Sequence, residues 1–143
     1  MHFAHSNGSE IAFDIVGDGP PLVLHPGMFQ VGSHWTKAGY TAPLTTSHTM
    51  ITVDPLGLGA SDAPRDPEAY TLPRRAEYVV AVLDELGVDT AAYWGYSLGA
   101  LTGYAVAAHA PERLTRTAAE ELGFSSSGCG TARRKPPASN DLC

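Results

Sequence analysis

Short apolar runs separated by turn residues are the first pattern along the chain. Residues 10–16 mix apolar and polar positions, as a half-buried strand does. Leu22–Leu24 and Met50–Val53 are mainly apolar runs, which suit strands buried on both faces. A fourth run, Ala91–Trp94, is followed directly by Gly95. The pattern therefore predicts strands at these four places.

Between the third and fourth runs the apolar period changes to that of a helix. The apolar positions of this segment recur every three or four residues: Ala76, Val79, Val80, Leu83 and Leu86. Thr71 is placed to cap the start of this helix and Gly87 its end. An alanine-rich segment after residue 99 predicts a second helix, which Pro111 ends. Alternating strands and helices predict the α/β class, with a parallel sheet covered by helices.

The sequence Gly95-Tyr96-Ser97-Leu98-Gly99 joins the fourth strand to the second helix. A serine hydroxyl is a poor nucleophile unless it is exposed, aligned and deprotonated as it attacks. A sharp strand-to-helix turn lifts the hydroxyl off the end of the sheet, and such a turn leaves room only for small flanking residues. The alternative is an ordinary surface serine between two glycines.

Two further motifs follow predicted strands. His25-Pro26-Gly27-Met28 comes after the second strand, and Asp54-Pro55-Leu56-Gly57-Leu58-Gly59-Ala60-Ser61 comes after the third. With the serine motif, and in this order, they resemble the α/β-hydrolase family from about residue 11 to residue 116. The resemblance covers the N-terminal half of a complete family member. It implies a mostly parallel sheet with flanking helices, truncated after the helix that follows the nucleophile.

The resemblance also assigns roles. Ser97 matches the nucleophile, Gly95 and Gly99 match the elbow glycines, and the N–H of Leu98 matches one oxyanion donor. The inserted Pro26 leaves the second donor between Met28, which is favoured, and Phe29. The implied reaction is hydrolysis of a small ester-like substrate without cofactor or metal, and the substrate and subfamily stay open. A serine nucleophile argues against the aspartate-nucleophile branches, the haloalkane dehalogenases and epoxide hydrolases.

The family's acid and histidine follow the serine, and here the chain departs from the pattern. His109 is the one histidine after Ser97, on the same predicted helix and about 18 Å away at 1.5 Å per residue. That distance excludes a general base. The acids after the serine follow no strand-like segment: Glu112, Glu120, Glu121 and Asp141. Asp54 is interpreted as a residue that braces its loop, and His25 as structural. A truncated, non-catalytic chain is therefore the second hypothesis.

Composition divides the chain near its end. Residues 123–143 are rich in Ser, Gly, Arg and Pro and carry a net charge of +2, whereas residues 1–122 carry −8. We expect a hydrolase half-domain over 1–122 and a disordered or non-native tail over 123–143, and we hypothesise a frameshift or misplaced stop. The acidic balance argues against a nucleic-acid partner. The sequence shows no membrane span, signal peptide or histidine grouping for a metal, so we expect a cytoplasmic protein.

Two expectations concern packing. The aromatic residues Trp35, Tyr40, Tyr78 and Trp94 are interpreted as core or rim packing, with a ligand cage as the alternative. No strand-like run of apolar β-branched residues follows Pro111, so the chain is expected to lack the family's sixth strand. Ala91–Trp94 would then be an exposed edge strand without protecting charge or proline, which predicts self-association.

Overall fold

The computed structural model describes residues 1–120, and the predicted tail over 123–143 lies outside the described residues. Six strands form one sheet: β1 (His2–Ser6), β2 (Ser9–Gly17), β3 (Pro21–His25), β4 (Thr49–Val53), β5 (Ala91–Tyr96) and β6 (Leu114–Glu120). The helices are α1 (Ser33–Lys37), α2 (Leu72–Glu85) and α3 (Leu98–His109), with short 3-10 turns η1 (Ala42–Leu44), η2 (Pro67–Tyr70) and η3 (Pro111–Arg113).

The strand order is β1-β2-β4-β3-β5-β6. β2 pairs antiparallel with both β1 and β4. The other three pairs are parallel: β4 with β3, β3 with β5, and β5 with β6. The four predicted strands and the α/β class are confirmed. β1 was not predicted, because its five residues include two histidines and bury only Ala4.

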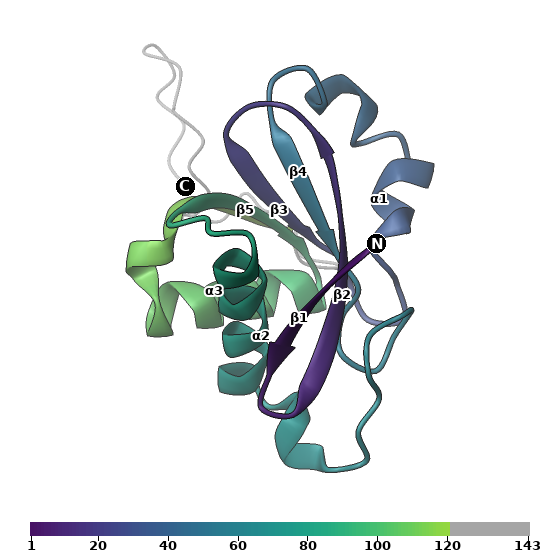
Figure 1. The fold of residues 1–143 in the computed structure, drawn as a ribbon, viewed down its shortest axis with the longest axis vertical. Coiled ribbons are helices and arrows are strands. Elements are labelled where there is room, and N and C mark those ends of the chain that lie inside the picture. Colours follow the sequence, from purple (N-terminus) through teal and green to yellow (C-terminus); the bar gives the residue numbers. More distant parts are fainter. Residues whose placement is uncertain (121–143) are drawn as a thin grey trace, which may run out of the picture.

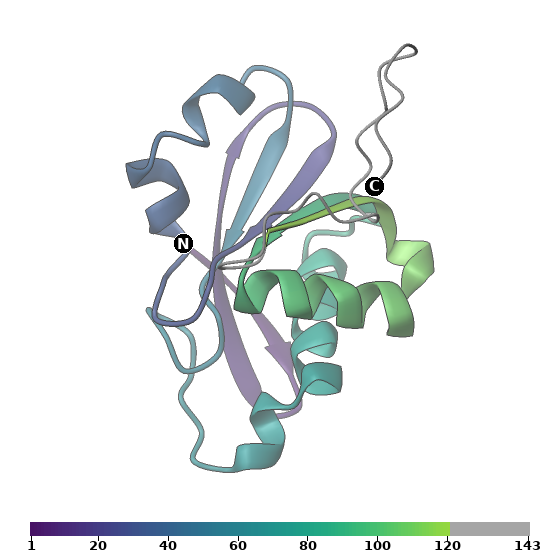
Figure 2. The same ribbon diagram turned by 180° about the vertical axis from the view of Figure 1, so that it is seen from behind.

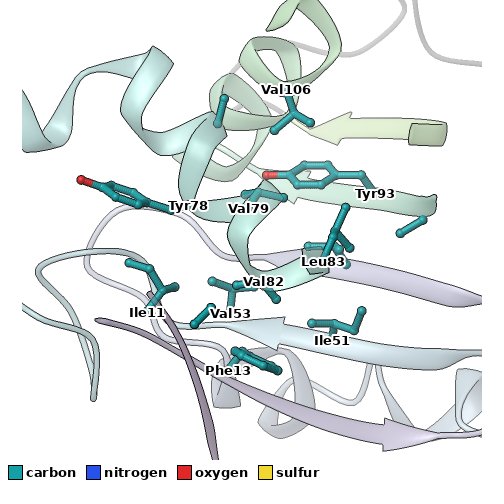
Figure 3. Close-up of a cluster of buried hydrophobic side chains, with 14 of the residues drawn as sticks. Ile11, Phe13, Ile51, Val53, Tyr78, Val79, Val82, Leu83, Tyr93 and Val106 are labelled. Atoms are coloured by element: carbon teal, nitrogen blue, oxygen red, sulfur yellow. The ribbon is translucent and has the colours of Figure 1, made fainter. Parts of the chain in front are cut away.

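Helices lie on both faces of the sheet (Figures 1 and 2). The larger core lies under α2 and α3, where Phe13, Ile51 and Val53 of the sheet meet Val82 and Leu83 of α2 (Figure 3). The opposite face carries a smaller cluster, formed by Leu22, Leu24, Met50 and Trp35 of α1. Neighbouring residues of one strand enter different clusters because side chains alternate between the faces of a sheet.

The capping residues predicted for α2 occupy the expected places, but only one of them acts as predicted. Thr71 occupies the N-cap position, but its hydroxyl donates to the carbonyl of Glu68 and does not cap the helix. At the other end Leu86 is the C-cap, and Gly87 follows it with φ +63°. The left-handed conformation of this glycine lets the chain turn away from the helix.

The expectation about the sheet edge was wrong. Residues 114–120 form β6, which pairs in parallel with the whole length of β5, so Ala91–Trp94 is an inner strand. Thr115, Arg116 and Ala118 of this strand are exposed. The mixed sequence Leu-Thr-Arg-Thr-Ala-Ala-Glu can therefore form a strand without the apolar run that a strand buried on both faces needs. The chain continues one strand beyond the helix at which truncation was expected.

A buried tyrosine of β5 holds α3 on the sheet. The hydroxyl of Tyr93 donates to the carbonyl of Gly99 at 2.7 Å, and a Cβ at Gly103 would lie 2.5 Å from its ring. The missing side chain at Gly103 thus lets α3 approach the sheet closely. The residue is 1% exposed, and its ring supports the first two turns of α3, whose N-cap is Ser97.

Tyr93→Phe tests this contact. Removing the hydroxyl leaves the Gly99 carbonyl without one partner in a buried place, so we expect the free energy of unfolding to fall by about 1 kcal/mol. Tyr40→Phe, at a side chain that is 47% exposed, is the matched control and should change it by less than about 0.5 kcal/mol. Urea denaturation of the three proteins measures both changes. Equal stability of Tyr93→Phe and the wild type would contradict the role given to this hydroxyl.

Candidate active site

The candidate site lies where two parallel strands end side by side. β3 and β5 are neighbours, and their register sets His25 opposite Gly95. β4 follows β3 in the chain but pairs on its other side, so the strand order reverses between β3 and β5. Crevices outside the carboxyl ends of such strands are the usual ligand sites of open α/β sheets. The loop after β3 and the serine after β5 both lie at this point.

Ser97 has a backbone conformation that L-residues rarely adopt, with φ 53° and ψ −113°. It joins the last residue of β5 to the first of α3. A Cβ at Gly95 would lie 2.3 Å from the carbonyl oxygen of Gly99, and a Cβ at Gly99 would lie 2.1 Å from that of His25. Both glycines are therefore sterically required, as the motif predicted. Strain of this kind is typical of functional positions.

The first turn of α3 begins directly after Ser97. The first bond of this helix runs from the N–H of Leu101 to the carbonyl of Ser97 at 3.1 Å. The amides of Leu98, Gly99 and Ala100 precede it and have no helical acceptor. The N-terminus of a helix also carries a partial positive charge. The predicted donor Leu98 is thus the first residue of a helix whose end favours an anion.

The loop after β3 turns sharply next to Ser97. The N–H of Gln30 donates to the carbonyl of Gly27 at 3.2 Å, which closes a turn with Met28 and Phe29 at its centre. Phe29 has φ +62°, as the third residue of a type II turn requires. Gly27 packs against the serine, since a Cβ there would lie 3.2 Å from Cβ of Ser97. The turn bond uses neither central amide.

Asp54 braces two loops around the site, as its sequence context suggested. One carboxylate oxygen accepts a hydrogen bond of 2.8 Å from the N–H of Gly32, which lies at the end of the loop after β3. The other accepts the N–H of Ala60 at 3.0 Å. The hydroxyl of Ser61 donates to the Asp54 carbonyl at 2.6 Å and accepts the N–H of Ala12 at 2.8 Å. The third sequence motif is therefore a hydrogen-bonded support for the loop that carries Met28.

His25 is buried at the end of β3. Its ring is 4% exposed, and its Nδ1 lies 3.0 Å from the carbonyl oxygen of Pro26, to which it donates. It lies on the same sheet face as Tyr93, with ring centroids 6.3 Å apart. Burial lowers the pKa of His25 to about 4, so the imidazole is neutral at pH 7. The structural interpretation of His25 fits these contacts.

His109 lies at the far end of α3, twelve residues after Ser97, as the sequence predicted. The helix separates the two side chains by about 18 Å. Glu112 is exposed in η3, and the side chain of Glu120 and all of Glu121 and Asp141 lie outside the described part. The expectation that His109 cannot reach Ser97 agrees with this placement, and the one of these acids whose side chain is described, Glu112, is exposed in η3.

The aromatic residues near the site pack on one another. The ring centroids of Trp35, Tyr40 and Trp94 lie between 5.0 and 5.5 Å apart in all three pairs. Tyr78 belongs to the larger core and donates to the Ala69 carbonyl. These contacts are those of packing residues. A cavity of about 250 Å³ is lined by two of these rings, Trp35 and Tyr40, and by Pro26, Gln30 and Tyr96.

Comparison with known proteins agrees with this geometry. Residues 20–122 match the model of the α/β hydrolase fold. The chain belongs to the α/β-hydrolase fold family. A protein of Azorhizobium caulinodans named "Putative carbamate hydrolase RutD" is 31% identical over 80% of this chain and 42% of its own length. A haloalkane dehalogenase of Mycolicibacterium paratuberculosis is 30% identical over 85% of this chain and 38% of its own.

Among solved structures, Est816, described as an N-acyl homoserine lactone degrading enzyme, superimposes with a TM-score of 0.76 and 30% identity. The match covers 82% of this chain and 44% of Est816. The chain thus spans less than half the length of the relatives it matches. These relatives are named for different hydrolytic reactions, so they define the family and not the substrate.

Within residues 1–120, no group of three or more His, Cys, Asp or Glu side chains is arranged to hold a metal ion. No helix of the same part is long and apolar enough to cross a membrane.

The burial of His25 predicts a pH dependence of stability. Its pKa falls from 6.5 in the unfolded chain to about 4 in the folded protein, so only the unfolded state takes up a proton between these values. The free energy of unfolding should therefore be unaffected above pH 6.5 and should fall by up to about 3 kcal/mol as the pH drops to 4.

Urea denaturation between pH 7.5 and pH 4.5 measures this loss, as the difference between the wild type and His25→Gln. The subtraction removes the titration of carboxylates, which both proteins share. His34→Gln, at an exposed histidine, is the control and should keep the full wild-type dependence. A wild type and a His25→Gln variant with parallel pH profiles would show that His25 is not buried in its neutral form.

Proposed function

We propose that Ser97 is the nucleophile position of a serine hydrolase that cleaves small carboxylic esters or related acyl compounds. One observation carries this proposal. Ser97 occupies a turn with φ 53° between β5 and α3, and Gly27 packs against it. A serine between a helix N-terminus and a sharp turn is the arrangement that acyl transfer needs, and this supports the proposal.

The reaction would proceed in two steps. Oγ of Ser97 attacks the substrate carbonyl, its proton passes to a base, and the alcohol leaves with a proton to give an acyl-enzyme. Water then attacks the acyl-enzyme with the same proton transfers and releases the acid. In both steps the N–H groups of Leu98 and Met28 donate to the oxyanion of the tetrahedral intermediate. No cofactor or metal is needed.

Met28 is preferred to Phe29 as the second donor because of its place in the turn. The amide nitrogen of Met28 is bonded directly to the carbonyl carbon of Gly27, the residue that contacts Ser97. The amide of Phe29 is one residue further along the loop. The side chains of both residues are exposed, by 56% and 81%, and would border the substrate.

Proton transfer is the step for which the described residues offer no candidate. His109 is a helix length away, and burial lowers the pKa of His25 to about 4, which makes its imidazole a weak base. This supports the alternative function, a chain that binds an acyl compound at the amides beside Ser97 without hydrolysing it. The two functions share one site and differ in whether a base reaches Ser97.

The substrate class rests on the relatives. Est816 is described as degrading an N-acyl homoserine lactone, a cyclic ester, and a lactone carbonyl meets the same requirements as an open ester. The cavity beside Pro26, Gln30 and Tyr96 would accept part of a small apolar substrate.

Labelling by a fluorophosphonate probe tests whether a base is present. Such a probe reacts with a serine whose proton is removed during attack, so the 143-residue chain should label at Ser97 slower than a complete serine hydrolase by a factor on the order of 10⁴. Ser97→Ala gives the background, and mass spectrometry of the labelled peptide locates the site.

Rapid stoichiometric labelling at Ser97 would contradict the non-catalytic alternative and show that a base does reach the serine. His25→Gln then decides its source: loss of labelling in this variant would assign the base to His25. Rapid labelling of a different serine would contradict the assignment of Ser97 itself.

A further inference from the structure

Gln30, at the end of the turn beside Ser97, makes two hydrogen bonds to Gly27. Its backbone N–H donates to the Gly27 carbonyl at 3.2 Å, and its side-chain Oε1 accepts the N–H of Gly27 at 2.9 Å. A backbone N–H can only donate, so the side-chain atom that faces Gly27 is the oxygen of the Gln30 amide. Both polar groups of the Gly27 backbone are therefore bonded to one residue.

These two bonds hold the peptide groups on either side of the Gly27 Cα. The N–H of Gly27 belongs to the peptide group that it shares with Pro26, and its carbonyl belongs to the one that it shares with Met28. Because each peptide group is planar, one bond restrains φ of Gly27 and the other restrains ψ. A glycine needs this restraint more than other residues do, since no side chain limits its rotation.

Close packing against the serine explains why residue 27 has no side chain. A Cβ at Gly27 would lie 3.1 Å from Oε1 of Gln30, and 3.2 Å from both Cβ of Ser97 and Cδ1 of Tyr96. These distances are tighter than the contacts that Cβ atoms normally make. The glycine thus lets the loop approach Ser97, but it also makes the backbone more flexible at this point. The side chain of Gln30 restores the lost rigidity.

We propose that Gln30 is a positioning residue that aims the N–H of Met28 at the oxyanion, an inference that rests on the proposed function of Ser97. The peptide between Gly27 and Met28 is trans, so its N–H points away from its carbonyl. That carbonyl is turned toward the amide of Gln30, which directs the Met28 N–H to the opposite side, out of the turn. An oxyanion donor stabilises the transition state only if it is held in place beforehand. Gln30 therefore acts through Gly27 on a donor that belongs to another residue.

Gln30→Met in the 143-residue chain tests the proposal, because methionine is unbranched and of similar length but is only a weak acceptor. Labelling of Ser97 by a fluorophosphonate is followed in mildly alkaline buffer, where hydroxide can take the serine proton and no internal base is needed. We expect labelling at least about tenfold slower than in the wild type. Removal of a whole oxyanion donor costs about 10²–10³-fold, and here the donor is displaced and not removed.

Tyr70→Phe is the matched control. It also removes a hydrogen bond from a part-buried side chain to the backbone, the 2.7 Å bond to the Pro64 carbonyl, but in the loop before α2. This variant should label at the wild-type rate. Urea denaturation verifies that both variants are folded and compares their stability, so slow labelling of Gln30→Met alone cannot be an effect of a less stable fold.

Hydrogen exchange gives a readout that does not depend on catalysis. The amide of Gly27 should exchange at least about tenfold faster in Gln30→Met than in the wild type, because it loses its acceptor. Gln30→Glu keeps an acceptor oxygen and should keep the slow exchange. Unchanged exchange in Gln30→Met, or fast exchange in both variants, would overturn the proposal.

The labelling rates separate this proposal from the one on Ser97. Equal labelling of Gln30→Met and the wild type would overturn the role of Gln30 and leave that of Ser97 intact. A wild type that labels at Ser97 no faster than the Ser97→Ala background would overturn the proposed function, and the role of Gln30 with it.

Discussion

The site depends on how closely α3 begins beside the end of β3. At Gly99 there is no room for a Cβ, because the carbonyl oxygen of His25 would lie 2.1 Å from it. The helix can start so near the neighbouring strand only if the chain reverses within one residue. That residue is Ser97, and its positive φ follows from this constraint. Tyr93 beneath the helix and the turn at Gly27 hold the arrangement from two sides.

Most of this arrangement could be predicted from the sequence, because its parts are local. The strand ends, the order of the three motifs and the need for small residues at Gly95 and Gly99 all follow from short stretches of chain. The bracing role of Asp54 was predicted in the same way. Its partners Gly32 and Ala60 are known only from the structure, since they depend on how two loops meet.

What the sequence analysis missed or left open also has a physical reason. β6 was missed because much of it is exposed and so lacks the apolar run of a buried strand, and because its pairing with β5 is non-local. β1 was missed because it buries a single alanine. The choice between Met28 and Phe29 depends on a turn whose geometry the inserted Pro26 hid from motif comparison. In each case the deciding contact lies outside the segment that was being interpreted.

The proposed function depends on the backbone arrangement that positions Ser97 beside the start of α3 and the turn at Gly27. This backbone arrangement is tested most directly by the free energy of unfolding of Gly99→Ala, measured by urea denaturation. The added Cβ would meet the His25 carbonyl, and backbone atoms cannot move aside as a flexible side chain can, so we expect a loss of at least about 3 kcal/mol. Gly8→Ala, with positive φ but open space, should lose only about 1 kcal/mol. A Gly99→Ala variant as stable as Gly8→Ala would contradict the account.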